Sequence, residues 1–253
     1  MVGLLLFPSL LSARTQRVLL DRLLHRDLSN PKHNTNMHLF HHVTYPASAT
    51  TLNNQATSFF ATSRDHQLLP KDAAIHRPVT VERMLQRMLR WMTLGGQYDW
   101  TAKVYPDEQH PPFPSDISQL LKAFFPNVEP EAAIVNFYTP GDTLSVHRDV
   151  SEECDQSLIS VSLGCDGIFL IGNEDGSKHA TIRLRSGDAV LMSGESRFAW
   201  HAIPKVLSNT CPNWLEPWPA GGNPRAYEQW RDWMKTKRIN INVRQMKNPT
   251  CDE

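Results

Sequence analysis

Three side chains of the kinds that hold metal ions stand out in the second half of the chain. His147 and Asp149 are separated by one residue. On a β-strand such residues point the same way, so the imidazole and the carboxylate would share one face. Together they supply two of the three ligands in the facial triad of non-haem iron(II), and His201 is the candidate for the third. The alternatives are a solvated surface pair and a buried histidine with ordinary hydrogen bonds.

A second polar pattern lies near the C-terminus, at residues 238–244. Its strict alternation predicts a half-buried strand, with Ile239, Ile241 and Val243 on the apolar face. The other face carries two arginines and two asparagines: Arg238, Asn240, Asn242 and Arg244. Arginine binds a carboxylate through two parallel hydrogen bonds and keeps its charge, so this face suits a planar dianion. An exposed basic strand is the alternative.

The order of these motifs is similar to that of a known enzyme family. Four motifs follow one another: Asn-x-Tyr at 136–138, His-x-Asp at 147–149, the distant His201, and Arg-x-Asn-x-x-x-Arg at 238–244. From about Arg90 to Lys247 the chain resembles the AlkB-type iron(II)/2-oxoglutarate dioxygenases. Residues 89–95 and 111–116 resemble the AlkB homologue one subgroup in particular.

For the metal, the resemblance assigns His147, Asp149 and His201 as the iron(II) ligands. Three protein ligands leave three coordination positions, two for 2-oxoglutarate and one for dioxygen. The implied reaction converts 2-oxoglutarate to succinate and carbon dioxide and hydroxylates an N-methyl group on a nucleobase, which then loses formaldehyde. We therefore expect an N-demethylase with a nucleic-acid partner, either RNA, with tRNA the first choice, or DNA.

For 2-oxoglutarate, the resemblance assigns five residues of two strands: Asn136, Tyr138, Arg238, Asn240 and Arg244. Arg238 would pair with the distal carboxylate, and Asn136 and Tyr138 would add hydrogen bonds. Asn240 and Arg244 would complete the pocket near the metal.

Recognition of a base outside its stack requires aromatic faces. The family takes such aromatics from the region before the core, where Trp91, Tyr98 and Trp100 are the candidates. The alternative for these three is a lid of the hydrophobic core. Three positions depart from the family pattern. Gly96 replaces an expected aromatic, Ser151 stands where bacterial members carry an acid, and Asn242 stands where they usually carry Thr.

Three other functions are alternatives to demethylation. A 2-oxoglutarate dioxygenase acting on protein side chains would use the same iron and co-substrate residues. A non-catalytic nucleic-acid-binding jelly roll would need the fold alone. A Ser/His/Asp hydrolase is disfavoured because the chain lacks a Gly-x-Ser-x-Gly motif.

The patterns predict an α+β fold with a mainly β core, a double-stranded β-helix of jelly-roll type with N-terminal and flanking helices. We expect residues 1–131 to form a helical and loop annex with the nucleotide-recognition region, and 132–253 to form the catalytic core. The expected strands are 4–7 (buried), 133–138, 143–149, 157–164, 167–171, 180–184, 188–192, 198–203 and 239–245. The expected helices are 13–28 with Val18 inward, 80–91 capped by Thr80, 115–125 capped by Ser115 or Asp116, and 224–235.

Composition limits the function classes further. The 253 residues carry no net formal charge, so nucleic-acid binding must come from a local basic patch. The four scattered cysteines (Cys154, Cys165, Cys211 and Cys251) fit reduced thiols in an intracellular protein, in a compartment that the sequence leaves open. No apolar run is long enough to span a membrane, and we expect a monomer.

Overall fold

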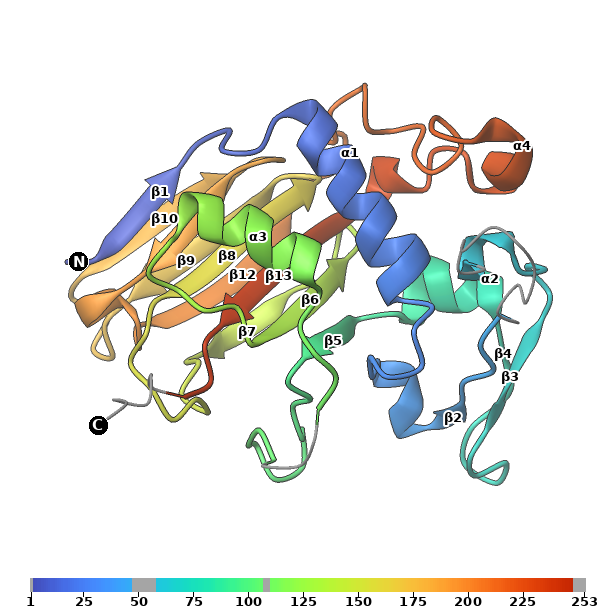
Figure 1. Cartoon of the computed structure of the whole chain (residues 1–253), viewed down its shortest axis with the longest axis horizontal. Coiled ribbons are helices and arrows are strands. Elements are labelled where there is room, and N and C mark those ends of the chain that lie inside the picture. The colour runs from blue at the N-terminus through green and yellow to red at the C-terminus, as the bar shows by residue number, and fades with distance from the viewer. Residues whose placement is uncertain (1, 47–57, 107–109, 248–253) are drawn as a thin grey trace.

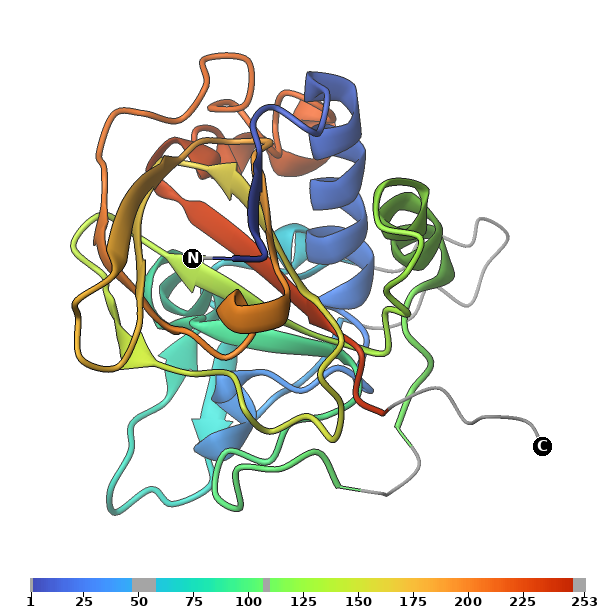
Figure 2. The same ribbon diagram turned by 90° about the vertical axis from the view of Figure 1, so that its left-hand side faces the viewer.

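Two β-sheets face each other and form the core of the computed structural model, which describes residues 2–46, 58–106 and 110–247. The larger sheet has six strands and the smaller has four. Helices α1 (Ala13–Asp21) and α3 (Ser115–Phe124) lie against the outer face of the larger sheet (Figures 1 and 2). The predicted jelly-roll fold with flanking helices is confirmed.

The strands of the larger sheet are β1 (Leu4–Phe7), β11 (Ala189–Met192), β8 (Leu158–Gly164), β13 (Arg238–Arg244), β6 (Ala132–Tyr138) and β5 (Trp91–Gly95). Those of the smaller sheet are β10 (His179–Leu184), β9 (Gly167–Gly172), β12 (Trp200–Val206) and β7 (Leu144–His147). The strands predicted from 133 to 245 are all present, with shifted ends. β1 and β5 come from the first 131 residues, so the annex and the core share one sheet.

The central element is β13, because it pairs with β6 on one side and β8 on the other. Its register sets Arg238 opposite Tyr138 and Asn240 opposite Asn136. Every residue of β13 is buried. Residues on alternate positions therefore form one polar face inside the molecule, which is where a ligand-binding set must lie.

The annex contains a small three-stranded sheet of β2 (His41–His42), β3 (Gln67–Pro70) and β4 (Val79–Thr80). It leads into α2 (Val81–Arg83), which continues as a π-helical turn, Met84–Met88. The predicted cap is confirmed, since the Thr80 hydroxyl accepts a hydrogen bond from the Arg83 backbone N–H.

The helix predicted at 80–91 is too long. The backbone turns extended at Leu89, and Trp91 begins β5, which pairs with β6. Met92 and Leu94 are buried at alternate positions of this strand. The apolar residues of the helix, spaced three and four apart, are followed directly by the alternating apolar residues of β5. The hydrophobic pattern alone therefore does not show where the helix ends and the strand begins.

Two predictions of burial near the N-terminus are wrong, one for the first strand and one for Val18. β1 lies at an edge of the larger sheet, and its Leu5 and Leu6 are exposed. The helix predicted at 13–28 is α1 (Ala13–Asp21) followed by a π-helical turn, Arg22–Asp27. Val18 is half exposed instead of inward, because Leu19 and Leu20 already supply the face that packs on the sheet.

Two further helices differ from prediction in their ends. α3 spans Ser115–Phe124, and its N-cap residue is Pro114, without a side-chain cap bond. The helix predicted at 224–235 is limited to α4 (Pro224–Tyr227) and short 3-10 turns at Glu228–Trp230 and Met234–Thr236. These turns keep Trp230, Trp233 and Met234 buried.

Cys154, Cys165 and Cys211 are buried free thiols, and Cys251 lies outside the described residues. In the described part of the chain, no helix combines the length and apolarity that a bilayer crossing requires.

His25 joins the N-terminal helix to the C-terminal part of the chain. Its ring stacks between Tyr227, with centroids 4.5 Å apart, and Trp218, at 5.1 Å. Its Nδ1 lies 2.8 Å from the Ser58 hydroxyl. Burial lowers the pKa of His25 to about 4. The folded protein therefore holds this imidazole neutral.

We predict that His25 makes the fold sensitive to mild acid. Because its folded pKa lies below the ordinary value of 6.5, the unfolded chain takes up the proton first, and the free energy of unfolding falls as the pH drops from about 6.5 towards 4. Between pH 8 and pH 5 this amounts to about 2 kcal/mol. Urea denaturation of the wild type and His25→Gln at both pH values measures it, and equal pH dependence in the two proteins would contradict the assignment.

Candidate active site

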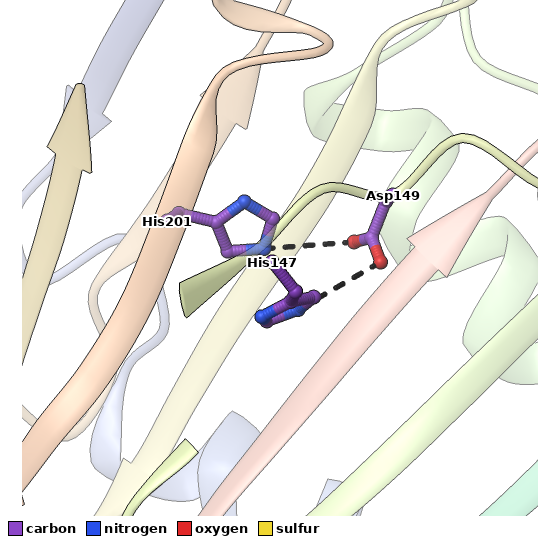
Figure 3. A group of neighbouring side chains, drawn as sticks. All are labelled: His147, Asp149 and His201. Carbon is purple, nitrogen blue, oxygen red and sulfur yellow. Dashed lines mark ion pairs between the residues drawn. The ribbon is translucent and has the colours of Figure 1, made fainter. Parts of the chain in front are cut away.

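The three metal-ligand candidates meet at one point between the two sheets. His147 at the end of β7 and His201 on β12 are direct partners in the register of the smaller sheet, and Asp149 follows two residues after β7. The His147 Nε2 lies 3.9 Å from Asp149 Oδ1, and the His201 Nε2 lies 3.7 Å from Asp149 Oδ2. The ligand atoms of all three lie within 4.8 Å of one another. Figure 3 shows both rings and the carboxylate turned towards a common centre.

Hydrogen bonds hold both imidazoles in the tautomer that a metal needs. His147 Nδ1 lies 2.8 Å from the Ser145 carbonyl oxygen, and His201 Nδ1 lies 3.1 Å from the Ala199 carbonyl oxygen. A carbonyl only accepts, so each Nδ1 carries the proton and each Nε2 keeps its lone pair. The two Nε2 atoms and one carboxylate thus fit a facial site for iron(II).

Asp149 is also supported from β13. Asn242 Nδ2 donates to Asp149 Oδ2 at 2.9 Å, and Arg244 Nη2 lies 3.3 Å from the same oxygen. Burial alone would raise the pKa of Asp149, but Arg244, together with His201 and His147, outweighs it and lowers the pKa to about 2. The carboxylate is therefore ionised at neutral pH and ready to bind a cation.

Two residues that sequence reasoning missed complete this support. The Glu152 side chain is fully buried, 3.0 Å from Arg244 Nη1 and 2.9 Å from Arg197 Nη2. Arg197 also donates from Nη1 to the Asp149 backbone carbonyl at 2.9 Å. We call Asp149, Glu152, Arg197 and Arg244 the charge quartet. Its two acids and two bases balance, so the interior carries no net charge there.

The predicted 2-oxoglutarate residues lie on one face of the larger sheet. Asn136 and Asn240 line the cavity over the metal ligands. Arg238 and Tyr138 are the next pair along the same face. Asn240 donates from Nδ2 to Ser160 Oγ at 2.7 Å, which fixes its amide.

Arg238 is the residue that most clearly lacks a partner. It is fully buried, and burial lowers its pKa. Its Nη2 donates to Ser162 Oγ at 3.0 Å, whereas within the described residues its Nε and Nη1 have no hydrogen-bond partner. A buried guanidinium with two free donors is costly, so this side chain fits the carboxylate of a bound ligand.

A cavity of about 460 Å³ opens above the metal ligands. Tyr98 and Trp100 line it, and Trp91 packs behind Trp100 with ring centroids 4.8 Å apart. The Tyr98 hydroxyl lies 3.2 Å from the Ser151 hydroxyl. Tyr105, not singled out from the sequence, lies with its ring 5.2 Å from that of Tyr98 and accepts a hydrogen bond from Arg244. The three predicted aromatics therefore form one cluster, in which Tyr98 and Trp100 face the cavity.

Two imidazoles and one carboxylate, open towards a cavity, define a mononuclear non-haem iron(II) oxygenase site. The chain belongs to the 2OG-Fe(II) oxygenase superfamily, whose family model matches residues 3–244. Its cofactors are therefore iron(II), 2-oxoglutarate and dioxygen, as predicted.

The chain is 49% identical to the N6-methyladenosine RNA demethylase ALKB1 of Pyricularia oryzae, over 97% of this chain and 74% of that protein. It is 39% identical to the tRNA demethylase abh1 of Schizosaccharomyces pombe, over 97% of this chain and 79% of that protein. The solved structure of OsALKBH1 superimposes with a TM-score of 0.60 at 20% identity, covering 96% of both chains, and supports the fold. The resemblance to AlkB-type enzymes is confirmed.

We predict that Glu152→Gln weakens metal binding about tenfold, the usual effect of losing a group that orients a ligand. Without the Glu152 charge, Arg244 turns fully to Asp149 and competes with the metal for its lone pairs. Anaerobic titration with iron(II), or with cobalt(II) followed by absorption, measures the affinity. The matched control is Glu153→Gln, because Glu153 is exposed. Equal affinity of Glu152→Gln and wild type would refute the role of the quartet.

We predict that Arg238→Met raises the dissociation constant for 2-oxoglutarate on the order of 100-fold, which corresponds to about 3 kcal/mol for one charge-assisted pair. The unliganded protein should keep or gain stability, because the change removes a buried and partly unpaired guanidinium. Calorimetric titration of the manganese(II)-loaded protein and thermal melting check the two parts. A stability loss without a change in affinity would make Arg238 a structural residue only.

Proposed function

We propose that this protein is an iron(II)- and 2-oxoglutarate-dependent dioxygenase that removes N-methyl groups from nucleobases in RNA, with tRNA the first choice, or in DNA. The observation that carries the proposal is the convergence of His147 Nε2, His201 Nε2 and the Asp149 carboxylate beneath a cavity lined by Tyr98 and Trp100. When bound, iron(II) and 2-oxoglutarate would supply, with dioxygen as the oxidant, the oxidation of the N-methyl group to a hydroxymethyl group, which leaves as formaldehyde.

Different residues of the chain would bind the iron, the 2-oxoglutarate and the base. His147, Asp149 and His201 would hold iron, while Arg238, with Tyr138 and Asn136 beside it, would bind the distal carboxylate of 2-oxoglutarate. Asn240 and Arg244 would complete the pocket near the metal. Tyr98 and Trp100 present aromatic faces to the cavity, suited to stacking a base that has left its helix.

The charges around the cavity favour a nucleic acid over a protein side chain as substrate. Among the described residues of its lining, Asp149 is the single acid, and the bases are Lys103, Arg148 and Arg244. Because Asp149 and Arg244 pair with each other, the remaining charge is positive. Not all of the basic residues near the site contribute, since Lys237 is buried with its Nζ donating to the Gln86 carbonyl oxygen.

The names of the relatives are consistent with this proposal, because they describe RNA and tRNA demethylases. Activity on protein side chains is the second candidate, since it would use the same iron and co-substrate residues. The enzyme is proposed to work as a monomer inside the cell, and the buried free thiols support the second part, a reducing compartment.

We predict demethylation when the protein is incubated with iron(II), 2-oxoglutarate and total tRNA or N-methylated RNA and DNA oligonucleotides. Nucleoside mass spectrometry should show loss of an N-methyl base, with succinate and formaldehyde released in equal amounts. Asp149→Ala should abolish both products while the circular dichroism spectrum is retained. Succinate formation stimulated by a peptide and by none of the nucleic acids would favour the protein substrate instead.

A further inference from the structure

Exposed arginines lead away from the rim of the cavity. Arg83 and Arg87 lie four residues apart on the helix made by α2 and the turn Met84–Met88, and Arg90 follows directly after it. All three side chains are exposed. Residues four apart share one helical face about 6 Å apart along the axis. We call these three residues the arginine ridge.

The ridge begins next to a residue of the cavity lining. Arg90 forms an ion pair with Asp142, in the turn between β6 and β7, and the next residue, Thr143, lines the cavity. Arg87 and Arg90 also lie close enough to Lys237 to act on it, since burial first and then these two charges lower its pKa to about 8. Asp142 offsets part of this charge, and among the described residues Arg87 is left as an unpaired positive charge near the opening.

The surrounding annex has an excess of positive charge in a chain without net charge. Residues 30–91 contain seven lysines and arginines and three acids. Of the acids, Glu82 pairs with Arg64, and Asp72 accepts a hydrogen bond from a backbone N–H. In the part of the chain that the structure describes, Arg83 and Arg87 form no salt bridge, so their charges are available to a polyanion.

Next to the N-terminal end of the ridge, the loop between β3 and β4 carries exposed apolar and basic side chains, and Phe40, just before β2, packs against His76 of this loop. Phe40 and Ile75 are 49% and 73% exposed, and Lys71 and Arg77 are exposed beside them. In both views this loop and the loop after β5 lie at the same, lower end of the molecule (Figures 1 and 2). Interleaved basic and aromatic groups are typical of surfaces that bind single-stranded nucleic acid.

We propose that the arginine ridge binds the phosphates of the substrate strand next to the nucleotide whose base enters the cavity. The strand would leave the rim at Thr143 and pass over Arg90, Arg87 and Arg83 towards Phe40. The proposal rests on the function proposed above and adds to it a nucleic-acid surface outside the cavity.

The test compares two double variants that each remove two exposed charges. Arg83→Ala/Arg87→Ala changes the ridge, and Arg185→Ala/Lys205→Ala changes the turn after β10 and the strand β12. Fluorescence anisotropy of a labelled 20-nucleotide single-stranded RNA is measured over a salt series. The ridge variant should bind about tenfold more weakly at low salt, and its slope of log affinity against log salt should be smaller by about 1.4, the value for two phosphates. Arg83→Lys/Arg87→Lys should restore both.

Turnover separates this proposal from the proposed function. The ridge variant should demethylate a methylated trinucleotide as fast as wild type, and the 20-nucleotide substrate more slowly. Equal binding of the 20-mer by the ridge variant and wild type, or an equal loss in the Arg185/Lys205 control, would overturn the ridge. If wild type demethylates neither substrate, the proposed function fails, and the salt slopes still decide whether the ridge binds RNA.

Discussion

The buried carboxylate of Asp149 is the interaction on which the rest of the site depends. It has to stay ionised in a desolvated place, and Arg244 together with the two imidazoles makes that possible. If the Arg244 guanidinium had no other partner, it would compete with the metal ion for the Asp149 carboxylate. Glu152 shares Arg244 from its other side, and Arg197 binds both Glu152 and the Asp149 backbone. The charge quartet thus keeps the Asp149 carboxylate ionised and leaves it available to bind the metal ion.

One strand supplies both ends of the ligand site, and the two ends are built differently. At the metal end, Arg244 of β13 is balanced by acids. At the other end, Arg238 is fully buried and its two free donors have no protein partner within the described residues. A fold tolerates such a group where a ligand carboxylate compensates for it. The asymmetry matches a diacid, with one carboxylate placed towards the metal and the other against Arg238.

The sequence predicted the parts of this site that follow strand periodicity. His147 and Asp149, or Arg238 and Asn240, share a face because residues two apart on a strand do so. His201 required a further step, from the motif order to the pairing of β12 with β7, and the structure confirms that pairing. Glu152 and Arg197 were missed because no local pattern joins residues 45 positions apart. The strand β5 was missed for a different reason, because the apolar spacing of the preceding helix continues into it without a turn signal.

Zero net charge argues against a general attraction to nucleic acid, yet the charge is unevenly distributed along the chain. The seven bases and three acids of residues 30–91 leave an equal negative excess on the rest of the chain. At physiological ionic strength, charges act over about 8 Å, so a strand near the cavity responds to the annex and to the cavity wall and hardly to distant acids. The positive charge near the cavity and the aromatic contacts can therefore direct a nucleotide to the metal. The zero net charge of the whole chain limits nonspecific binding of nucleic acid to the rest of the surface. Under the proposed function, selectivity would depend on whether a base can leave its stack and reach the cavity wall at Trp100, which favours unpaired positions in the substrate.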